Sequence, residues 1–398
     1  MGRYRRLPAN VVAIGLVSLL NDSSSEIIYP LLPIFLASTL GASAGAIGII
    51  EGLAESISSL LKLFAGHLSD RLGKRKFLVV GGYALAAVMR PFLAFAGNWH
   101  QVLAIRVGDR VGKGIRTAPR DAMIADSVRF EQRGLAFGFH RAMDHAGAVI
   151  GPIIGYVLVV LLAANFTRIF LIAAIPAFLA VIVAIFVMKE SPRTDGIKPV
   201  KLSLRGFDGN FKRFLLILAL FTLSNSSDSF LILRARDSGV SVAIIPLLWA
   251  AHHASKVLSS LYGGDLSDRL GRKRLIVSGW VLYAAVYAGF AFVSNATSAW
   301  VLFLIYGLYF GLAEGAEKAL VADLVRPEQR GTAYGLYNLA FGITVFPASL
   351  VMGMIWDWKG PSTAFLVSAV MGVTAAILLL IFVQQRTENE LAPGGLKT

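Results

Sequence analysis

Residues 66–76 read GHLSDRLGKRK, and residues 264–274 read GDLSDRLGRKR. Both stretches contain a glycine, an aspartate–arginine pair, a second glycine and a run of basic residues at the same spacing. The second stretch follows the first by about half of a 398-residue chain, and each comes after a long apolar segment. The sequence therefore predicts two copies of one structural unit, each with a basic connection between two apolar helices.

Two further signals recur in the same order in both halves of the chain. They are Asp126 followed by EQRG at 131–134, which recurs as Asp323 followed by EQRG at 328–331, and NDSSS at 21–25, which corresponds to NSSDS at 225–229. Three matched signals in one order favour duplication over chance. Duplicated helical halves with a binding site between them are typical of membrane transporters.

The composition indicates a membrane protein. Hydrophobic residues make up 56% of the chain and charged residues only 16%, against roughly 45–50% and about 25% in soluble domains. Hydropathy and turn signals predict twelve membrane-spanning helices, over residues 10–38, 45–66, 76–97, 100–127, 134–163, 167–188, 213–234, 241–264, 274–294, 298–325, 331–356 and 361–384. We therefore expect an all-α membrane protein with two pseudo-symmetric six-helix bundles.

A polar linker over residues 190–212 divides the chain into an N-terminal bundle (1–189) and a C-terminal bundle (213–398). The basic residues that give the net charge of +14 lie mostly in the linker and in short loops on its side of the membrane. This pattern predicts cytoplasmic termini and a multi-pass protein of the bacterial inner membrane, rather than a nucleic-acid-binding protein. The chain has no cysteine, which excludes disulfides and thiol-based sites.

The stretch at 66–76 resembles the signature of the major facilitator superfamily in the loop after its second helix. Gly66, Asp70, Arg71 and Gly73 match that signature, and the later copy includes Asp268 and Arg269. The resemblance covers essentially the whole chain. It implies two six-helix bundles around a central cavity that opens alternately to each side, with these six residues acting in gating.

Span five contains a second signature, Gly147, Gly151, Pro152 and Gly155, which is similar to the glycine–proline motif of proton-coupled antiporters in that superfamily. Tyr156 replaces the usual last glycine. Small residues four apart also let two helices approach closely, so simple packing is the alternative explanation. In span four, residues 110–114 loosely resemble the arginine motif of the same antiporters.

Several ionisable residues fall at membrane depth, where each costs at least about 2.5–3.5 kcal/mol and indicates function by default. The candidates for substrate or proton binding are Asp22, Glu26, Glu55, Arg106, Arg110, Lys113, Arg141, Asp144, Asp228 and Glu314. A carboxylate in a partly dry cavity can exchange protons near neutral pH, as proton coupling requires. The same charges could instead form structural ion pairs between helices, and the sequence leaves both interpretations open.

The sequence therefore favours a secondary transporter that exports a small molecule in exchange for protons. The alternative is a proton-coupled symporter that imports an organic anion, zwitterion or iron chelate, because span four carries a cationic stripe. A non-transporting sensor or intramembrane enzyme is a third hypothesis, but no catalytic set, phosphate-binding loop or metal-ligand spacing supports it. We expect no cofactor and no metal, a monomer, and the substrate, protons and lipid as partners.

Overall fold

The computed structural model describes residues 7–72, 74–129, 132–190, 203–326 and 329–384, except for the side chains of residues 67, 70–72, 263–265 and 268. Every regular element within these residues is a helix. In chain order the elements are α1 (Ala9–Ile28), α2 (Leu32–Ser38), α3 (Ala44–Leu72), α4 (Arg75–Met89), the 3-10 helix η2 (Arg90–Phe95), α5 (Trp99–Asp126), α6 (Arg133–Leu161), α7 (Phe166–Phe186), α8 (Gly209–Ser224), α9 (Ser229–Asp237), α10 (Ile245–Leu270), α11 (Arg272–Phe292), α12 (Ala296–Asp323), α13 (Arg330–Lys359) and α14 (Pro361–Phe382).

These elements confirm the twelve predicted spans, but three of the spans are interrupted. The first span divides into α1 and α2 around Pro30, because proline lacks an N–H and its ring clashes with the preceding helical turn. The third changes from α4 to η2 at Arg90, which also precedes a proline. The seventh divides into α8 and α9 at residues 225–228, which lie next to the site described below.

The two signature stretches are more helical than the sequence analysis predicted. Helices α3 and α10 run on to Leu72 and Leu270, beyond the predicted ends at 66 and 264. The second stretch turns at Gly271, whose φ of +87° favours glycine. Arg269 lies in the last turn of α10, where a cation interacts favourably with the helix dipole and supports the longer helix.

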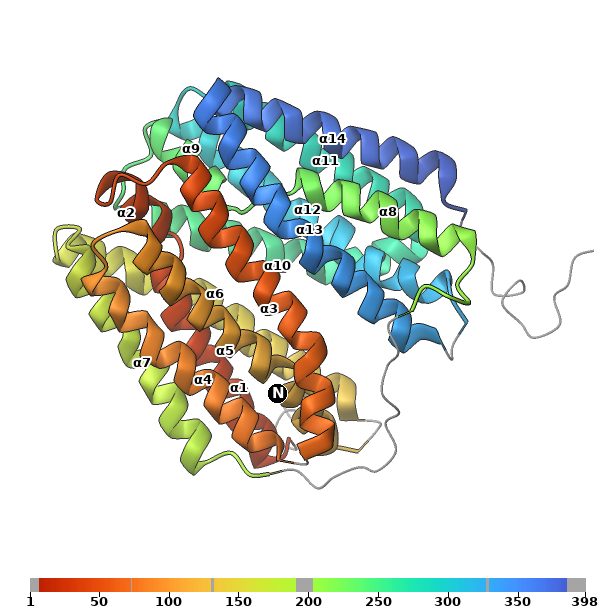
Figure 1. Cartoon of the computed structure of the whole chain (residues 1–398), viewed down its shortest axis with the longest axis horizontal. Coiled ribbons are helices and arrows are strands. Elements are labelled where there is room, and N and C mark those ends of the chain that lie inside the picture. Colours follow the sequence, from red (N-terminus) through yellow and green to blue (C-terminus); the bar gives the residue numbers. More distant parts are fainter. Residues whose placement is uncertain (1–6, 73, 130–131, 191–202, 327–328, 385–398) are drawn as a thin grey trace, which may run out of the picture.

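The helices form two bundles, with α1–α7 in one and α8–α14 in the other (Figure 1). Each bundle has its own apolar core. The core of the C-terminal bundle is rich in aromatic rings, including Phe221 stacked on Trp280 at a centroid distance of 4.1 Å. Buried polar groups are also present within the bundles, as in the ion pair of Arg90 and Asp109.

The bundles contact each other closely at the end of the molecule where α3 begins. There α3 packs on α13: a Cβ atom at Gly48 would clash with the carbonyl of Ser349, and one at Gly353 with the carbonyl of Ala44. Further along, Ser56 donates a hydrogen bond to a backbone carbonyl of α13. Figure 1 shows α3 and α13 separating toward their other ends. The space between the bundles is thus closed at one end.

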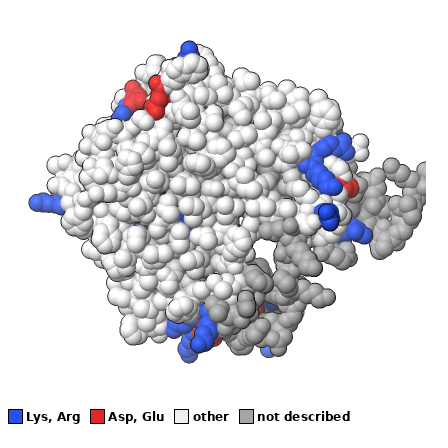
Figure 2. Space-filling model, in the orientation of Figure 1, with Lys and Arg blue, Asp and Glu red and all other residues white. Residues whose placement is uncertain are grey.

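The outer surface suits a lipid environment. Large apolar side chains are exposed along α7 and α14, including Phe178, Ile182, Ile377 and Ile381. Figure 2 shows a broad, mostly uncharged face, with charged side chains gathered toward the ends of the helices. Ten helical segments of the described chain are long and apolar enough to cross a membrane; α5 and α10 are not among them, because α5 carries many charges and α10 contains polar residues such as His252, His253 and Lys256.

Candidate functional site

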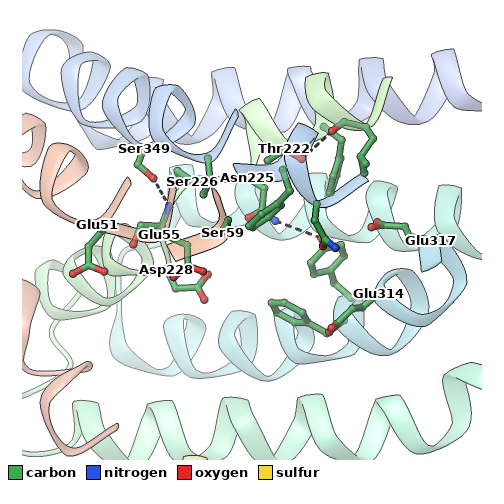
Figure 3. Close-up of a pocket in the computed structure, with 18 of the residues that line it drawn as sticks. Glu51, Glu55, Ser59, Thr222, Asn225, Ser226, Asp228, Glu314, Glu317 and Ser349 are labelled. Atoms are coloured by element: carbon green, nitrogen blue, oxygen red, sulfur yellow. Dashed lines mark hydrogen bonds between the residues drawn. The ribbon is translucent and has the colours of Figure 1, made fainter. Parts of the chain in front are cut away.

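A cavity of about 560 Å³ lies between the two bundles. Its lining comes from Tyr29, α3 and α5 on one side and from α8, the 225–228 break, α10, α12 and α13 on the other. Figure 3 labels Glu51 and Glu55 of the first side and Asp228 and Glu314 of the second. Such a volume is within the roughly 300–1,000 Å³ of small-molecule sites. The cavity therefore has the size and the two-sided lining expected of a substrate site.

The wall from the N-terminal bundle is an ion-pair network. Glu51 and Glu55 lie four residues apart on one face of α3 and meet the basic face of α5. Arg106 Nη2 lies 2.7 Å from Glu51 Oε2, and its Nε donates to Oε1 at 3.0 Å. Glu55 Oε2 lies 3.5 Å from Arg110 Nε and 4.0 Å from Lys113 Nζ. Most of the cationic stripe of α5, which includes Arg106, Arg110 and Lys113, is thus paired with carboxylates of its own bundle.

Glycines explain how α5 can reach these carboxylates. A Cβ atom at Gly114 would lie 2.6 Å from the Cβ of Leu61 on α3, and one at Gly112 would lie 2.5 Å from the carbonyl of Gly82 on α4. Helix α5 is therefore held close to both neighbours, as small residues permit.

The wall from the C-terminal bundle centres on Asp228, the residue directly before α9. Asp228 Oδ1 accepts a hydrogen bond from the phenol of Tyr306 at 2.8 Å. The neighbouring Ser227 N–H donates to Ser349 Oγ at 3.1 Å, which joins the break to α13. The interruption of the seventh span thus places a carboxylate at the cavity surface.

Aromatic rings cover much of the same wall. Tyr306 and Tyr309 are nearly parallel with centroids 5.8 Å apart, and Phe310 lies 4.8 Å from Tyr309. His252 stacks on the other side of Tyr306 at 5.1 Å. We call Phe221, Tyr306, Tyr309 and Phe310 the aromatic wall.

Two carboxylates on α12 have different partners. Glu314 lies 3.0 Å from Lys318 Nζ and 3.9 Å from Lys256 Nζ. Glu317 is buried, and its two oxygens accept from Trp280 Nε1 at 2.8 Å and from the Tyr337 phenol at 2.9 Å. Glu317 therefore has neutral donors where Glu314 has cations.

Five predicted site residues line this cavity: Glu55, Arg110, Lys113, Asp228 and Glu314. The other five lie outside its lining. Asp22 accepts from Asn21 Nδ2 at 2.9 Å, Glu26 accepts from Trp249 Nε1 at 2.8 Å, and Asp144 lies 3.5 Å from His140 Nδ1. Arg106 is buried in its ion pair with Glu51, and Arg141 is exposed on α6.

The sequence analysis did not select the aromatic wall, Ser226 or Glu317. Tyr306, Phe310 and Glu314 recur at intervals of four residues on α12, and Tyr309 lies on the same side. That spacing is the signal that could have found the wall.

The glycines of span five lie at a close helix crossing. A Cβ atom at Gly147 would lie 2.8 Å from the carbonyl of Leu19 on α1, and one at Gly151 would lie 2.5 Å from that of Ser23. Gly155 has ordinary space, and Pro152 lies within α6. These contacts agree with the packing explanation, and an antiporter role for the motif stays a prediction.

The gating residues are described only in part. Gly73 lies outside the described residues, and so do the side chains of Asp70, Arg71 and Asp268. At Gly66 a Cβ atom would make only an ordinary contact, 3.5 Å from Ala118. Within each half, the basic repeat contacts the acidic repeat. Arg75, the first residue of α4, pairs with Asp126, and Arg272, the first residue of α11, pairs with Asp323. Each basic stretch thus contacts the acidic repeat of its own half.

Among the residues that the structure describes, no group of three or more His, Asp or Glu side chains is placed to hold a metal ion. The chemistry that remains is that of ion pairs, hydrogen bonds and aromatic faces around a cavity. This arrangement can bind a small molecule.

Comparison with known proteins agrees with this architecture. The family model for the Major Facilitator Superfamily matches residues 14–316 and, in a second match, residues 213–397. The chain is 38% identical over 383 residues to MJ1317, an uncharacterised MFS-type transporter of Methanocaldococcus jannaschii, and the match covers 94% of this chain and 95% of that protein. It is 24% identical over 401 residues to the multidrug resistance protein MdtH of Aeromonas hydrophila, with 95% and 96% covered.

Solved structures show the same fold. A bacterial homologue of the human lysosomal transporter Spinster, in an inward-facing and occupied conformation, matches with a TM-score of 0.77 at 17% identity, covering 93% of this chain and 95% of that one. The repeated halves, the cavity between them and these matches lead to one conclusion. The chain belongs to the major facilitator superfamily of membrane transporters.

Proposed function

We propose that this transporter exports a small molecule in exchange for protons. The observation that carries the proposal is the charged cavity between the two repeats, because both bundles contribute charges to it and it is closed at one end only. Rocking of one bundle against the other around such a site is the physical basis of alternating access. The protein named MdtH, a distant relative, is a multidrug resistance protein, which favours export.

The orientation predicted from the basic loops supports the same direction. If the termini are cytoplasmic, the closed end where α3 begins faces outward and the substrate enters from the cytoplasm. Asp22, Glu26 and Asp144 are the proposed proton carriers, because they are carboxylates on the membrane-spanning helices α1 and α6 and have no Lys or Arg nitrogen within 4.0 Å among the described residues. We place the protein as a monomer in the bacterial inner membrane, with Asp70, Arg71 and their repeats as gating residues.

A second candidate is a symporter that imports an organic anion. Lys62 favours it, because this lysine lines the cavity and no described carboxylate lies within 4.0 Å of its Nζ. The direction of substrate movement under an imposed pH gradient separates the two. Export predicts accumulation on the acidic side of the membrane, and proton symport predicts accumulation on the opposite side.

Proteoliposomes that enclose the pH-sensitive dye pyranine test the proposal. Compounds found by thermal stabilisation of the purified protein are expected to drive proton movement against their own flux. Asp22→Asn and Asp144→Asn are each expected to reduce this coupled flux at least tenfold. Full proton-driven transport by both variants would remove them from the proton path, and no flux by the wild-type protein would overturn the proposal.

A further inference from the structure

The charges that line the cavity do not all have partners. Arg110 and Lys113 share Glu55, and Lys256 and Lys318 share Glu314. Asp228 differs, because no Lys, Arg or His nitrogen of the described chain lies within 4.0 Å of its carboxylate. A carboxylate at this depth costs several kcal/mol unless a cation or water compensates it. The cavity therefore contains a carboxylate without a direct ion-pair partner among the described residues, and Lys256 acts on it only from beyond 4.0 Å.

The geometry of Asp228 leaves one oxygen available. Oδ1 accepts from the Tyr306 phenol at 2.8 Å, and no described group donates to Oδ2. Two residues earlier, Ser226 is only 5% exposed, lines the cavity, and has a hydroxyl without a hydrogen-bond partner. The break between α8 and α9 thus places one carboxylate oxygen without a described donor at the cavity, with the buried Ser226 hydroxyl close by in the chain. Oxygen acceptors beside a negative charge are what an ammonium group requires.

The aromatic wall lines the same cavity, and the phenol of its Tyr306 contacts Asp228. The face of an aromatic ring attracts cations through its quadrupole, by about 0.5–2 kcal/mol according to its exposure. This wall already holds one cation, because Lys256 Nζ lies 3.8 Å from the centroid of Phe310. The rings nearer Asp228, Tyr306 among them, have no described cation over them. They provide apolar area as well as attraction for positive charge.

From this juxtaposition we infer that Asp228, Ser226 and the aromatic wall form a binding site for an organic cation, and that the substrate is an amphipathic amine or quaternary cation. This inference extends the proposed transport function and rests on it, because a bound cation is a substrate only if the protein transports it. A molecule of a few aromatic rings, tetraphenylphosphonium included, fits a cavity of about 560 Å³. Its positive group contacts Asp228 Oδ2, and its rings lie against the aromatic wall, of which Phe310 is the most exposed member.

The opposite charge preference is the competing outcome. Lys62 lies two helical turns beyond Glu55 on α3 and could attract an anion instead. Tetraphenylphosphonium and tetraphenylborate have nearly the same size and shape but opposite charge. Comparing these two probes separates charge recognition from simple apolar binding.

The test is equilibrium dialysis of radiolabelled tetraphenylphosphonium against the purified full chain in detergent. We expect saturable binding, at least tenfold weaker binding by Asp228→Asn, and unchanged binding by Asp237→Asn. Asp237 is a matched control, because it lies at the other end of α9 and pairs with Arg236 at 2.9 Å. Equal binding by the wild type and Asp228→Asn, or tighter binding of tetraphenylborate, overturns the inference.

Two further variants keep the test decisive if Asp228→Asn does not purify as a single species. Tyr306→Phe keeps the ring and is expected to bind within threefold of the wild type, whereas Tyr306→Leu removes the ring and is expected to bind at least fivefold more weakly. Equal binding by both variants contradicts the inference. Dialysis needs no proton gradient, so it tests this inference separately from transport. Cation binding without proton-driven flux would contradict only the transport proposal. Proton-driven flux of an anion without cation binding would contradict only this inference.

Discussion

The carboxylate of Asp357 on α13 caps the first turn of α3 in the other bundle. Its two oxygens accept hydrogen bonds from the backbone N–H groups of Ala44 at 2.9 Å and Gly45 at 2.8 Å. Residue 45 has to be small, because a Cβ atom there would lie 2.8 Å from Asp357 Oδ2. An acidic group at a helix N-terminus satisfies free N–H groups and interacts favourably with the helix dipole. One side chain thus joins the two bundles at their closed end.

Removing this cap is expected to favour opening of the closed end. Replacing an N-cap acid by alanine costs about 1 kcal/mol, which corresponds to roughly a fivefold change in a conformational equilibrium. The chain has no cysteine, so a single Ser349→Cys reporter can be introduced between the bundles. We predict that Asp357→Ala raises the reaction rate of this cysteine with an impermeant maleimide, added on the side where α3 begins, about fivefold.

The matched control is Lys359→Gln, two residues further along α13, where the side chain lies over Trp358 rather than on the other bundle. This variant is expected to label at the rate of the reporter alone. Asp357→Asn keeps one acceptor oxygen and should lie between the two. Equal rates in all variants would show that the cap does not hold this end closed.

The glycines of span five make a second prediction, because their surroundings differ. A Cβ atom at Gly151 would lie 2.5 Å from the Ser23 carbonyl and 2.8 Å from Glu26 Cβ, whereas at Gly155 the nearest atom is 3.5 Å away. Gly151→Ala therefore forces α1 and α6 apart and should destabilise the protein by about 1–3 kcal/mol. Gly155→Ala should be neutral or slightly stabilising, because alanine favours a helix more than glycine does.

Thermal unfolding of the two variants in detergent, with proton-driven flux measured in parallel, tests this difference. A motif that acts as a unit in antiport would make both glycines equally sensitive. If Gly155→Ala lost coupled flux while keeping its stability, the motif would have a role beyond helix packing.

The large-scale architecture could be predicted because its signals are local. Apolar runs of membrane length identify the spans, and GDLSDRLGRKR at 264–274 repeats 66–76 almost residue for residue. The interruption at 225–228 was not predicted as a break. Its sequence, NSSD, corresponds to NDSS at 21–24, which lies inside the unbroken helix α1. Similar residues thus have different backbone conformations in the two halves.

The site was harder to predict because its contacts join helices far apart in the sequence. Glu314 and Glu317 are the same residue type and one turn apart, yet only Glu314 pairs with lysines. Which partner each one meets depends on how α11 and α13 pack on α12. The cationic stripe of span four suggested an anionic substrate. In the structure, however, Arg106 pairs with Glu51 and Arg110 pairs with Glu55, both on α3. Residue counts alone could not show this neutralisation.

The ion pair of Arg106 and Glu51 makes a third prediction. Both side chains are over nine-tenths buried, and two hydrogen bonds of 2.7 and 3.0 Å join them. Arg106→Met leaves the carboxylate without its partner and should destabilise the protein by about 3–5 kcal/mol. The double variant Arg106→Met with Glu51→Leu should recover most of this loss. Lys113→Met is the control, because that lysine is 36% exposed and 4.0 Å from Glu55, and it should cost about 1 kcal/mol or less.

Chemical unfolding followed by tryptophan fluorescence measures these differences. Tetraphenylphosphonium binding by the double variant then separates structure from function. Retained binding would show that Arg106 is a structural residue, and lost binding in a stable double variant would return it to the substrate site.

A fourth prediction concerns Glu26 and Trp249, which join α1 to α10 across the two bundles. Trp249 is 4% exposed and donates from Nε1 to Glu26 Oε2 at 2.8 Å, while His253 Nε2 lies 3.9 Å from the same oxygen. Glu26→Gln keeps an oxygen that can accept from Trp249 but cannot carry the charge. If Glu26 carries a coupling proton, this variant should lose proton-driven flux at least tenfold while still exchanging substrate for substrate.

Trp249→Phe is the complementary change, because it keeps an aromatic ring between the bundles and removes only the donor. A hydrogen bond to a charged group contributes about 1.5–3 kcal/mol, so the rate of exchange should change about tenfold or more while coupling to protons persists. Counterflow and pH-driven uptake of tetraphenylphosphonium in the same proteoliposomes measure the two properties separately. Proton-driven flux that survives in Glu26→Gln but disappears in Trp249→Phe would reverse these assignments, because the contact between the bundles rather than the carboxylate would then determine coupling.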